Sequence, residues 1–457
     1  MWDMTELWRF FRRRRPLLLY GVGLAAVSSF GQTFFISLFV PSFLEAFPLT
    51  PASFGILYAV ATLTGALLLP LTARWIDRIP LSGYTGAVLG TLALSALLVA
   101  GSGTVWMLGL GLLGLRLSGQ GLSSHAGLTV MARYFSKERG KALSIATLGF
   151  PLGEAVLPLA LAGFLAVAGW RLGWVVVAAV VLGVALPLIL RLLRSAAVEL
   201  DPLRLNVDGG MDPDAGTGKA EAGHAHTDRA RTGEASPGRH QGPVGPGART
   251  PVGQPSTSGE WSASRVLRDR RFWLLVPAAL LPPFWATGLI LYQTSLASAK
   301  GWSLPMLASA FVGFALARII TSLAIGGGID RYSARRLFPA AVLPMGLGVA
   351  LLAMADGPWV AFAYLALLGA TVGLSGTLKT ALWAELYGIR HLGAIKSMEG
   401  TLMVVSTAAA PLVVGWALED PGRLLPLLWS CVGTVVGGFL MARVGLAESR
   451  GGGAGLP

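Results

Sequence analysis

The sequence is poor in charged residues. Only 13% of its 457 residues are Asp, Glu, Lys or Arg, whereas 54% are hydrophobic. Soluble domains carry about 25% charged residues, so this composition excludes a soluble globular protein. The hydrophobic residues also lack the alternation within roughly ten-residue segments that a transmembrane β-barrel needs. They form blocks of roughly 20 to 25 residues instead, which are long enough to cross about 30 Å of hydrocarbon as helices.

Residues and motifs that carry catalytic chemistry are scarce as well. Cys431 is the only cysteine in the sequence, so no intrachain disulfide can form. The apolar blocks contain no nucleotide-binding loop, nucleophile elbow or cluster of metal ligands. The sequence therefore predicts no enzymatic activity, no cofactor and no bound metal.

The net charge of +13 does not indicate a nucleic-acid-binding protein, because aromatic residues do not interleave with the basic ones. The Lys and Arg residues mark alternate ends of the apolar blocks, at residues 12–15, 74–78, 133–141, 331–336 and 390. Lys and Arg in short loops remain in the cytoplasm. The pattern predicts a multi-pass protein of the cell inner membrane, embedded in the lipid bilayer with both termini in the cytoplasm.

The chain contains twelve apolar blocks, six on each side of a polar segment. The first six cover residues 17–41, 52–76, 82–101, 104–133, 142–166 and 170–195. The second six cover residues 272–298, 304–328, 335–355, 358–387, 394–418 and 424–444. The polar residues 201–262 are rich in Gly, Pro, Ala and Thr, and are predicted to be a disordered cytoplasmic linker. We therefore predict an all-α membrane protein with an N-terminal six-helix bundle (1–200), this linker and a C-terminal six-helix bundle (263–457).

The two halves carry an internal repeat. Three pairs of residues have the same separation, namely Asp77 with Asp330 (330 − 77 = 253), Gly140 with Gly393 (393 − 140 = 253) and Pro158 with Pro411 (411 − 158 = 253). A constant offset between halves that each cross the membrane an even number of times indicates a tandem duplication in one orientation. Parallel repeats with a substrate site at their interface, near the bilayer midplane, are typical of transporters.

Several short motifs resemble those of one transporter family. After the eighth block, Gly326 lies four residues before Asp330-Arg331, and the basic pair Arg335-Arg336 follows. Residues 116–121 (RLSGQG) resemble a fourth-helix motif, and residues 149–153 (GFPLG) partly resemble a fifth-helix motif of antiporters. On these motifs the chain resembles the major facilitator superfamily. The resemblance implies twelve helices in two parallel six-helix repeats and secondary transport by alternating access.

The charges in the loops are predicted to form a cytoplasmic gate. Asp77-Arg78 and Asp330-Arg331 lie where a block leaves the membrane, and a carboxylate there can cap a neighbouring helix and pair with a basic residue. Glu385 and Glu399 are expected to pair with loop arginines in the same gate. Alternatively, the Asp-Arg pairs are turns with topology charges, and Lys379 extends its ammonium group to the membrane surface.

Arg318 is predicted to lie near the bilayer midplane. It precedes Asp330 by 12 residues (330 − 318 = 12), or roughly 18 Å along a helix. A charge at this depth costs about 2.5–3.5 kcal/mol, so it usually faces a cavity and has a function. Its planar guanidinium is predicted to anchor an anionic substrate, with a buried carboxylate of another helix as the alternative partner. An eighth-helix arginine also resembles the monocarboxylate and oxalate/formate exchanger branch, which implies a contact with the substrate carboxylate.

Two further charges lie deep in the first half. Glu154 is predicted either to couple transport to protons or to form a structural ion pair, for which Arg116 is the candidate partner. Arg116 itself is predicted to have a structural or coupling role rather than a direct substrate contact. His125, on the same helix as Arg116, is predicted to be a packing residue, with a proton relay as the alternative.

Uncharged polar residues at similar depth are candidate substrate contacts. The resemblance implies that the first and seventh helices line the cavity, and these helices carry Gln32, Tyr292 and Gln293. Tyr58 lies at a comparable depth in the second block. Hydrogen bonds between helices are the alternative role for each of these side chains.

Together these features predict a monomeric secondary transporter. Its substrate is expected to be a small organic anion, a carboxylate, coupled to protons or to a counter-anion. The alternative is a proton-coupled exporter of a hydrophobic drug or metabolite, which would not need Arg318. A non-transporting membrane sensor is the third hypothesis.

Overall fold

The computed structural model describes residues 4–135, 138–199, 263–388 and 391–451. All regular elements within these residues are helices, which confirms the predicted all-α class. The predicted linker at 201–262 lies outside the described residues.

The described helices form two sets, one in each half of the chain. In the first half they are α1 (Met4–Arg13), α2 (Arg15–Val27), η1 (Ser28–Gly31), α3 (Thr33–Ile36), η2 (Ser37–Phe39), α4 (Val40–Ala46), α5 (Pro51–Ala73), η3 (Arg74–Asp77), α6 (Leu81–Ala100), α7 (Val105–Gly114), η4 (Leu115–Ser123), α8 (Ser124–Tyr134), α9 (Arg139–Thr147), α10 (Gly149–Val180), η5 (Val181–Ala185) and α11 (Leu186–Glu199). In the second half they are α12 (Ala263–Arg268), α13 (Arg270–Leu291), α14 (Gln293–Ala299), α15 (Leu304–Tyr332), α16 (Ala334–Leu337), η6 (Pro339–Val342), α17 (Leu343–Met354), α18 (Pro358–Tyr387), α19 (Leu392–Leu418) and α20 (Pro421–Gly451).

The described helices account for the twelve predicted passes. Nine stretches are long and apolar enough to cross a membrane, and the bent pair Arg15–Gly31 with Thr33–Ala46 makes a tenth. The remaining two passes are the shorter apolar helix Pro339–Met354 and the continuous run of α7, η4 and α8. Within α10 the fifth pass ends and the sixth begins at Gly169, whose φ of 72° breaks the helix.

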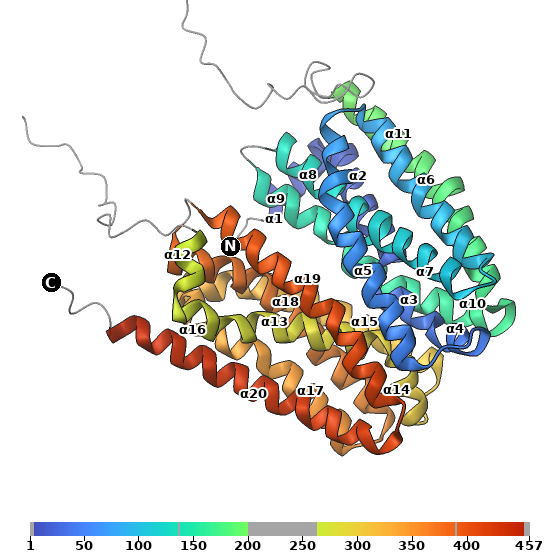
Figure 1. The fold of residues 1–457 in the computed structure, drawn as a ribbon. Coiled ribbons are helices and arrows are strands. Elements are labelled where there is room, and N and C mark those ends of the chain that lie inside the picture. The colour runs from blue at the N-terminus through green and yellow to red at the C-terminus, as the bar shows by residue number, and fades with distance from the viewer. Residues whose placement is uncertain (1–3, 136–137, 200–262, 389–390, 452–457) are drawn as a thin grey trace, which may run out of the picture.

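The two ends of the bundle differ in charge. One end, which we call the basic side, carries α12, α16 and most of the loop arginines, among them Arg133, Arg139, Arg331, Arg335 and Arg336, together with Asp77 and Glu385. The other end, which we call the far side, carries α4, α14 and the start of α5, and lies on the right in Figure 1. At the far side α5 begins with a capping box, in which Thr50 and Ser53 each accept a hydrogen bond from the other's backbone N–H.

The two halves meet along two helix pairs, because α5 packs along α19 and α10 packs along α15. Near the far side α5 and α19 approach so closely that only glycine fits. A Cβ atom on Gly55 would lie 2.5 Å from the Pro411 carbonyl oxygen, and one on Gly415 would lie 2.5 Å from the Pro51 carbonyl oxygen. Toward the basic side the ribbons of the two halves diverge (Figure 1).

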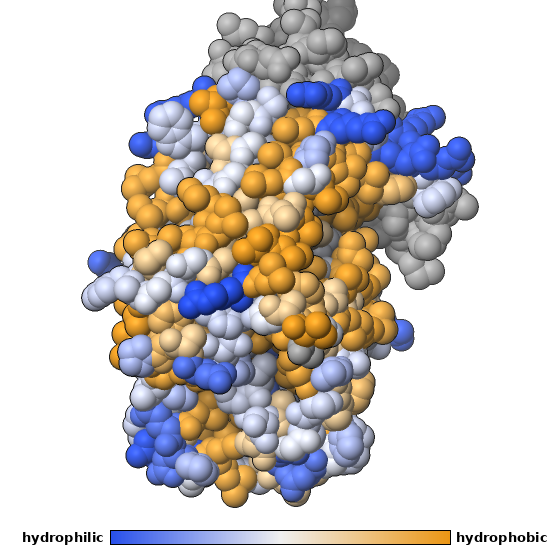
Figure 2. All heavy atoms as spheres, turned by 90° about the vertical axis from the view of Figure 1, so that its right-hand side faces the viewer, coloured by the Kyte–Doolittle hydropathy of each residue, from blue (hydrophilic) through white to orange (hydrophobic). Residues whose placement is uncertain are grey.

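The outer surface of the bundle is apolar. Large hydrophobic side chains remain exposed along the helices, including Leu67, Trp106 and Val167, the last of which is 90% exposed. Figure 2 shows hydrophobic residues over much of one face, interrupted by patches of hydrophilic residues. Soluble monomers rarely expose apolar surface on this scale, so these faces fit contact with lipid.

The three residue pairs of the internal repeat occupy equivalent places in the two halves. Asp77 ends η3 after the second pass, and Asp330 lies in the last turn of α15 after the eighth. Gly140 and Gly393 lie in the first turns of α9 and α19, and Pro158 and Pro411 lie inside α10 and α19. These positions support the prediction of a tandem duplication.

Candidate transport site

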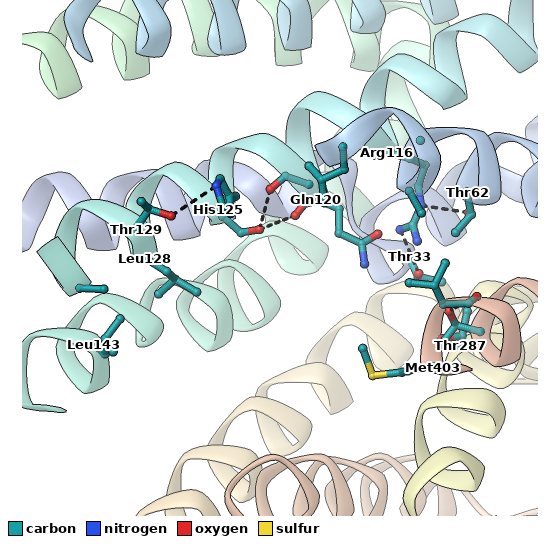
Figure 3. A pocket seen from close by; sticks show the side chains of 18 residues that line it. Thr33, Thr62, Arg116, Gln120, His125, Leu128, Thr129, Leu143, Thr287 and Met403 are labelled. Carbon is teal, nitrogen blue, oxygen red and sulfur yellow. Dashed lines mark hydrogen bonds between the residues drawn. The ribbon is translucent and has the colours of Figure 1, made fainter. Parts of the chain in front are cut away.

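A cavity of about 620 Å³ lies between the two halves. The first half contributes residues of α5, η4, α8 and α9, among them Thr62, Arg116 and His125, while α13 and α19 of the second half contribute Thr287 and Met403. In Figure 3 Arg116, Thr33 and Thr62 lie together toward one end, and His125, Leu128 and Leu143 extend toward the other. The lining reaches Ala132 and Leu143, near the basic side.

Arg116 is a buried cation at the inner end of this cavity. Its Nε donates to Thr62 Oγ1 at 3.2 Å, and its Nη1 donates to the Gly31 carbonyl at 3.3 Å and to Thr33 Oγ1 at 3.5 Å. The guanidinium carbon lies 5.0 Å from the centroid of the Tyr58 ring, within cation–π range. All these partners are neutral, and no carboxylate among the described residues pairs with Arg116. A full positive charge therefore borders the cavity.

The backbone around Arg116 packs closely against η1 in the first pass. Arg116 lies in η4, a π-helical segment, and such segments are frequent at functional sites. A Cβ atom on Gly119 would lie 2.7 Å from Gly31 Cα, so both glycines are needed for η1 and η4 to touch. This contact brings the Gly31 carbonyl to the guanidinium.

Glu154 and Arg318 form an ion pair that joins the two halves. Glu154 lies on α10 and Arg318 on α15, and Arg318 Nη1 donates to Glu154 Oε1. The glutamate side chain is 4% exposed and the arginine side chain 26%. Glu154 Oε2 is buried without a hydrogen-bond partner within the described part of the chain. Of the alternatives for Arg318, the structure contains the buried carboxylate, and the partner of Glu154 is Arg318 rather than Arg116.

The other predicted substrate contacts are engaged in contacts within the protein. Tyr292 Oη donates to the Pro51 carbonyl at 2.5 Å, and Gln293 Nε2 donates to Ser37 Oγ at 2.7 Å. Both bonds link the two halves near the far side. Gln32 Nε2 donates to Ser28 Oγ at 3.2 Å, within the bend of the first pass. Tyr58 shares a 2.9 Å hydrogen bond with Thr33, beside Arg116.

The predicted gate residues lie on the basic side. Asp77 pairs with Arg133, and Arg78 stacks on Trp75 with its guanidinium carbon 6.0 Å from the ring centroid. Arg331 stacks on Tyr332 at 5.2 Å. Asp330 is exposed and has no ion pair among the described residues.

Glu385 holds the loop that follows α15. Its carboxylate accepts from the backbone N–H of Ala334 at 2.8 Å, from that of Arg335 at 3.2 Å and from Ser333 Oγ at 2.7 Å. The Arg335 guanidinium also lies 3.9 Å from this carboxylate, as expected for a pair with a loop arginine.

Two predictions for this region are wrong, namely that Glu399 pairs with a loop arginine and that Lys379 extends its ammonium group to the membrane surface. Lys379 Nζ donates to Glu399 Oε1 at 2.7 Å, and the two side chains are only 12% and 9% exposed. The lysine therefore neither extends to the surface nor leaves Glu399 for a loop arginine. Sequence reasoning also missed Thr33 and Thr62, which carry no signal apart from their depth in apolar blocks.

These elements define a class of protein: a helical membrane protein with two similar halves and, between them, a cavity that a buried arginine borders. Residues 22–298 match the family model of the Major Facilitator Superfamily, which is more than half of the chain. The chain therefore belongs to the Major Facilitator Superfamily, and it is a membrane transporter rather than an enzyme. The predicted superfamily is thus confirmed.

Solved structures of other transporters share this fold. A bacterial homologue of the human lysosomal transporter Spinster, inward-facing and unoccupied, has a TM-score of 0.61 and 17% identity, with 96% of this chain and 97% of that chain covered. The same homologue in an inward-facing, occupied conformation has a TM-score of 0.64 with the same identity and coverage. The nucleoside transporter NupG has a TM-score of 0.61 and 12% identity, with 96% and 99% covered. No curated protein matches the chain in sequence.

Proposed function

We propose that this transporter carries a small organic anion, a carboxylate, and that the substrate competes with Glu154 for Arg318. The observation that carries the proposal is the pair that buried Glu154 forms with the partly exposed Arg318 across the seam between the halves. Alternating access requires the halves to move against each other. Because the Glu154–Arg318 pair bridges the halves, the partner that Arg318 binds is linked to the conformation of the whole molecule.

Competition follows from the cost of burying charge. An unpaired buried charge is strongly destabilising, whereas a hydrogen-bonded pair largely offsets the loss of hydration. When Glu154 takes up a proton, the carboxylate charge is lost and Arg318 is left without a counter-ion. A substrate carboxylate can then take the same guanidinium N–H groups in a bidentate geometry. Release of the proton from Glu154 restores the internal pair and displaces the substrate, which couples the two fluxes.

Arg116 supports an anionic substrate independently. Its charge borders the cavity and is met only by neutral acceptors in the described residues. A low-dielectric cavity with one sign of charge concentrates ions of the opposite sign. The pair at the seam is neutral in total, so Arg116 makes the local field positive. Glu154 and Arg318 do not line this cavity, so the anion that Arg116 attracts reaches Arg318 only when the halves move against each other.

The charge pattern supports the orientation that we propose. Lys and Arg gather on the basic side, so this side faces the cytoplasm of the inner membrane and carries both termini. The cavity lining reaches Ala132 and Leu143 on that side, while Tyr292 and Gln293 link the halves on the far side. In this orientation the described conformation is open to the cytoplasm. We propose that each monomer works alone, because the two halves that must move against each other belong to the same chain.

Uptake into proteoliposomes tests the proposed function. Radiolabelled acetate, lactate, oxalate and succinate serve as probes, each with and without an inward proton gradient. At least one is expected to accumulate with wild-type protein and to lose accumulation in Arg318→Gln. Arg423→Gln is the matched control, because Arg423 lies near the far end of the bundle and pairs with Asp420 on the surface. Wild-type accumulation by Arg318→Gln would overturn the anchor role.

One observation favours the second candidate, export of a hydrophobic compound. Leu69, Leu128, Met403 and Val404 form an apolar part of the cavity wall. An apolar ligand would bind there without Arg318. A screen of lipophilic dyes separates the candidates: dye export that survives in Arg318→Gln, together with no carboxylate uptake by the wild type, would favour the exporter.

A further inference from the structure

A second cavity, of about 520 Å³, lies on the basic side of the second half. It is formed where α16 and η6 meet the end of α20. Arg335, Arg336 and Arg443 line it together with Ser333, Pro339 and Leu446. We call this site the arginine pocket. It is separate from the transport cavity, with which it shares no lining residue.

The arginine pocket has an excess of positive charge. Of its three guanidinium groups, only that of Arg335 forms an ion pair with a carboxylate of the described residues, that of Glu385 at 3.9 Å. Neither Arg336 nor Arg443 forms an ion pair with any described carboxylate. Arg443 instead lies over the ring of Phe439, with its guanidinium carbon 5.9 Å from the ring centroid. Planar guanidinium forks of this kind match the geometry of phosphate oxygens.

The loop that carries two of these arginines is held in a fixed conformation. Ser333 has a φ of 69°, which a residue with a side chain adopts only when its surroundings enforce it. Glu385 enforces it, because its carboxylate accepts hydrogen bonds from Ser333, Ala334 and Arg335. The backbone N–H groups at the start of α16 are therefore already bound by an anion of the protein itself, the Glu385 carboxylate. The side chains of Arg336 and Arg443 remain available to a different anion.

The position of the pocket relative to the apolar surface identifies the kind of anion. Val436, Leu440 and Val444 lie four residues apart on α20 and are 46%, 55% and 50% exposed. Residues with this spacing form one stripe along a helix. The stripe leads toward Arg443, so the arginine pocket lies where the lipid-facing surface ends. A ligand with a phosphate group and hydrocarbon chains would contact both surfaces at once.

We infer that the arginine pocket binds the phosphate of an anionic phospholipid, with the acyl chains along the α20 stripe. Basic pockets at the edge of transmembrane helices bind lipid head groups in this way. The arginine pocket includes residues of the loop after α15, which Glu385 holds in place, and both belong to the predicted gate. A bound head group would therefore stabilise the conformation of this loop.

Lipid binding by the purified full chain tests the inference. Fluorescent short-chain phosphatidylglycerol and phosphatidylcholine are titrated separately into protein in detergent. Phosphatidylglycerol is expected to bind more tightly than phosphatidylcholine. The double variant Arg336→Gln/Arg443→Gln is expected to weaken phosphatidylglycerol binding by at least about tenfold. The variant Arg336→Lys/Arg443→Lys, which keeps the charge, is expected to keep most of the binding and shows that the site tolerates substitution.

Arg423→Gln is the matched control. Arg423 also stacks on an aromatic ring, that of Trp416 at 4.5 Å, but it lies at the other end of the bundle. Its loss is expected to leave binding unchanged. Equal binding of the two lipids, or an unchanged affinity in the glutamine double variant, would overturn the inference. Inorganic phosphate that binds as tightly as phosphatidylglycerol would show that the pocket serves a free phosphate, and would overturn the assignment to a lipid.

Discussion

Arg116 and Arg318 are two arginines within the helices of one protein, the first buried and the second partly exposed, and their surroundings differ. Arg116 is held by threonine hydroxyl groups, a carbonyl oxygen and the face of Tyr58, all within the first half. Arg318 is held by Glu154 across the seam between the halves. The partners of Arg116 therefore stay in place when the two halves move against each other, and its positive charge is not neutralised. The ion pair of Arg318 is broken when Glu154 takes up a proton or when another carboxylate takes its place. Arg318 is therefore the arginine suited to respond to a substrate or a proton.

The largest effect is expected from breaking the ion pair. Arg318→Gln leaves Glu154 buried and unpaired, which is expected to destabilise the protein by about 3–5 kcal/mol. The double variant Arg318→Gln/Glu154→Gln is expected to recover most of this stability, because no charge remains unpaired, but not carboxylate uptake. Thermal unfolding of the purified proteins and proteoliposome uptake measure the two effects. A single variant as stable as the wild type would show that the pair contributes nothing.

A smaller effect is expected at Arg116, because no carboxylate loses its partner. Arg116→Met removes hydrogen bonds to neutral acceptors, which corresponds to about 1–3 kcal/mol. Without this charge the KM for the carboxylate is expected to rise, and the salt dependence of uptake is expected to weaken. Uptake measured from low to high salt checks this prediction. Arg116→Lys, which keeps the charge, should keep the salt dependence; if both variants behave alike, the role of Arg116 is structural.

The two halves also meet through neutral groups, and the smallest effect is expected there. Tyr292→Phe removes one hydrogen bond to the Pro51 carbonyl, or about 0.5–1.5 kcal/mol. The far side should then open more often. Ser42 lies on α4 and lines a far-side cavity together with Thr294 of α14. A cysteine introduced at Ser42 in a Cys431→Ser background should be alkylated several-fold faster by a membrane-impermeant reagent. Tyr364→Phe is the control, because the buried hydroxyl of Tyr364 has no hydrogen-bond partner in the described residues; equal acceleration by both variants would contradict the prediction.

The fold could be predicted from the sequence because hydrophobic length and loop charge act locally. Each block had to be long enough to span the bilayer, and each Asp-Arg loop marked the end of a pass. Arg318 and Glu154 were identified for the same reason, since a charge inside an apolar block is visible without knowledge of any partner. The repeat offset then gave the relation between the halves without any structural information.

The partners of these charges could not be predicted, because pairing depends on how helices cross. Glu154 and Arg318 are 164 residues apart and meet only because α10 packs along α15. The pairing of Lys379 with Glu399 was missed for the same reason, because the two residues lie on different helices, α18 and α19. The surroundings of Arg116 depend on the contact between Gly31 and Gly119, which has no sequence pattern.

The central claim is that Glu154 and the substrate carboxylate compete for Arg318, and the affinity of Glu154→Gln tests it most directly. Isothermal titration of the purified variant with the carboxylate that the wild type transports gives this affinity. Because glutamine cannot form the ion pair, the variant is expected to bind the carboxylate at least about tenfold more tightly than the wild type at neutral pH. Its affinity is also expected to be independent of pH. An affinity equal to that of the wild type, with the same pH dependence, would contradict the claim.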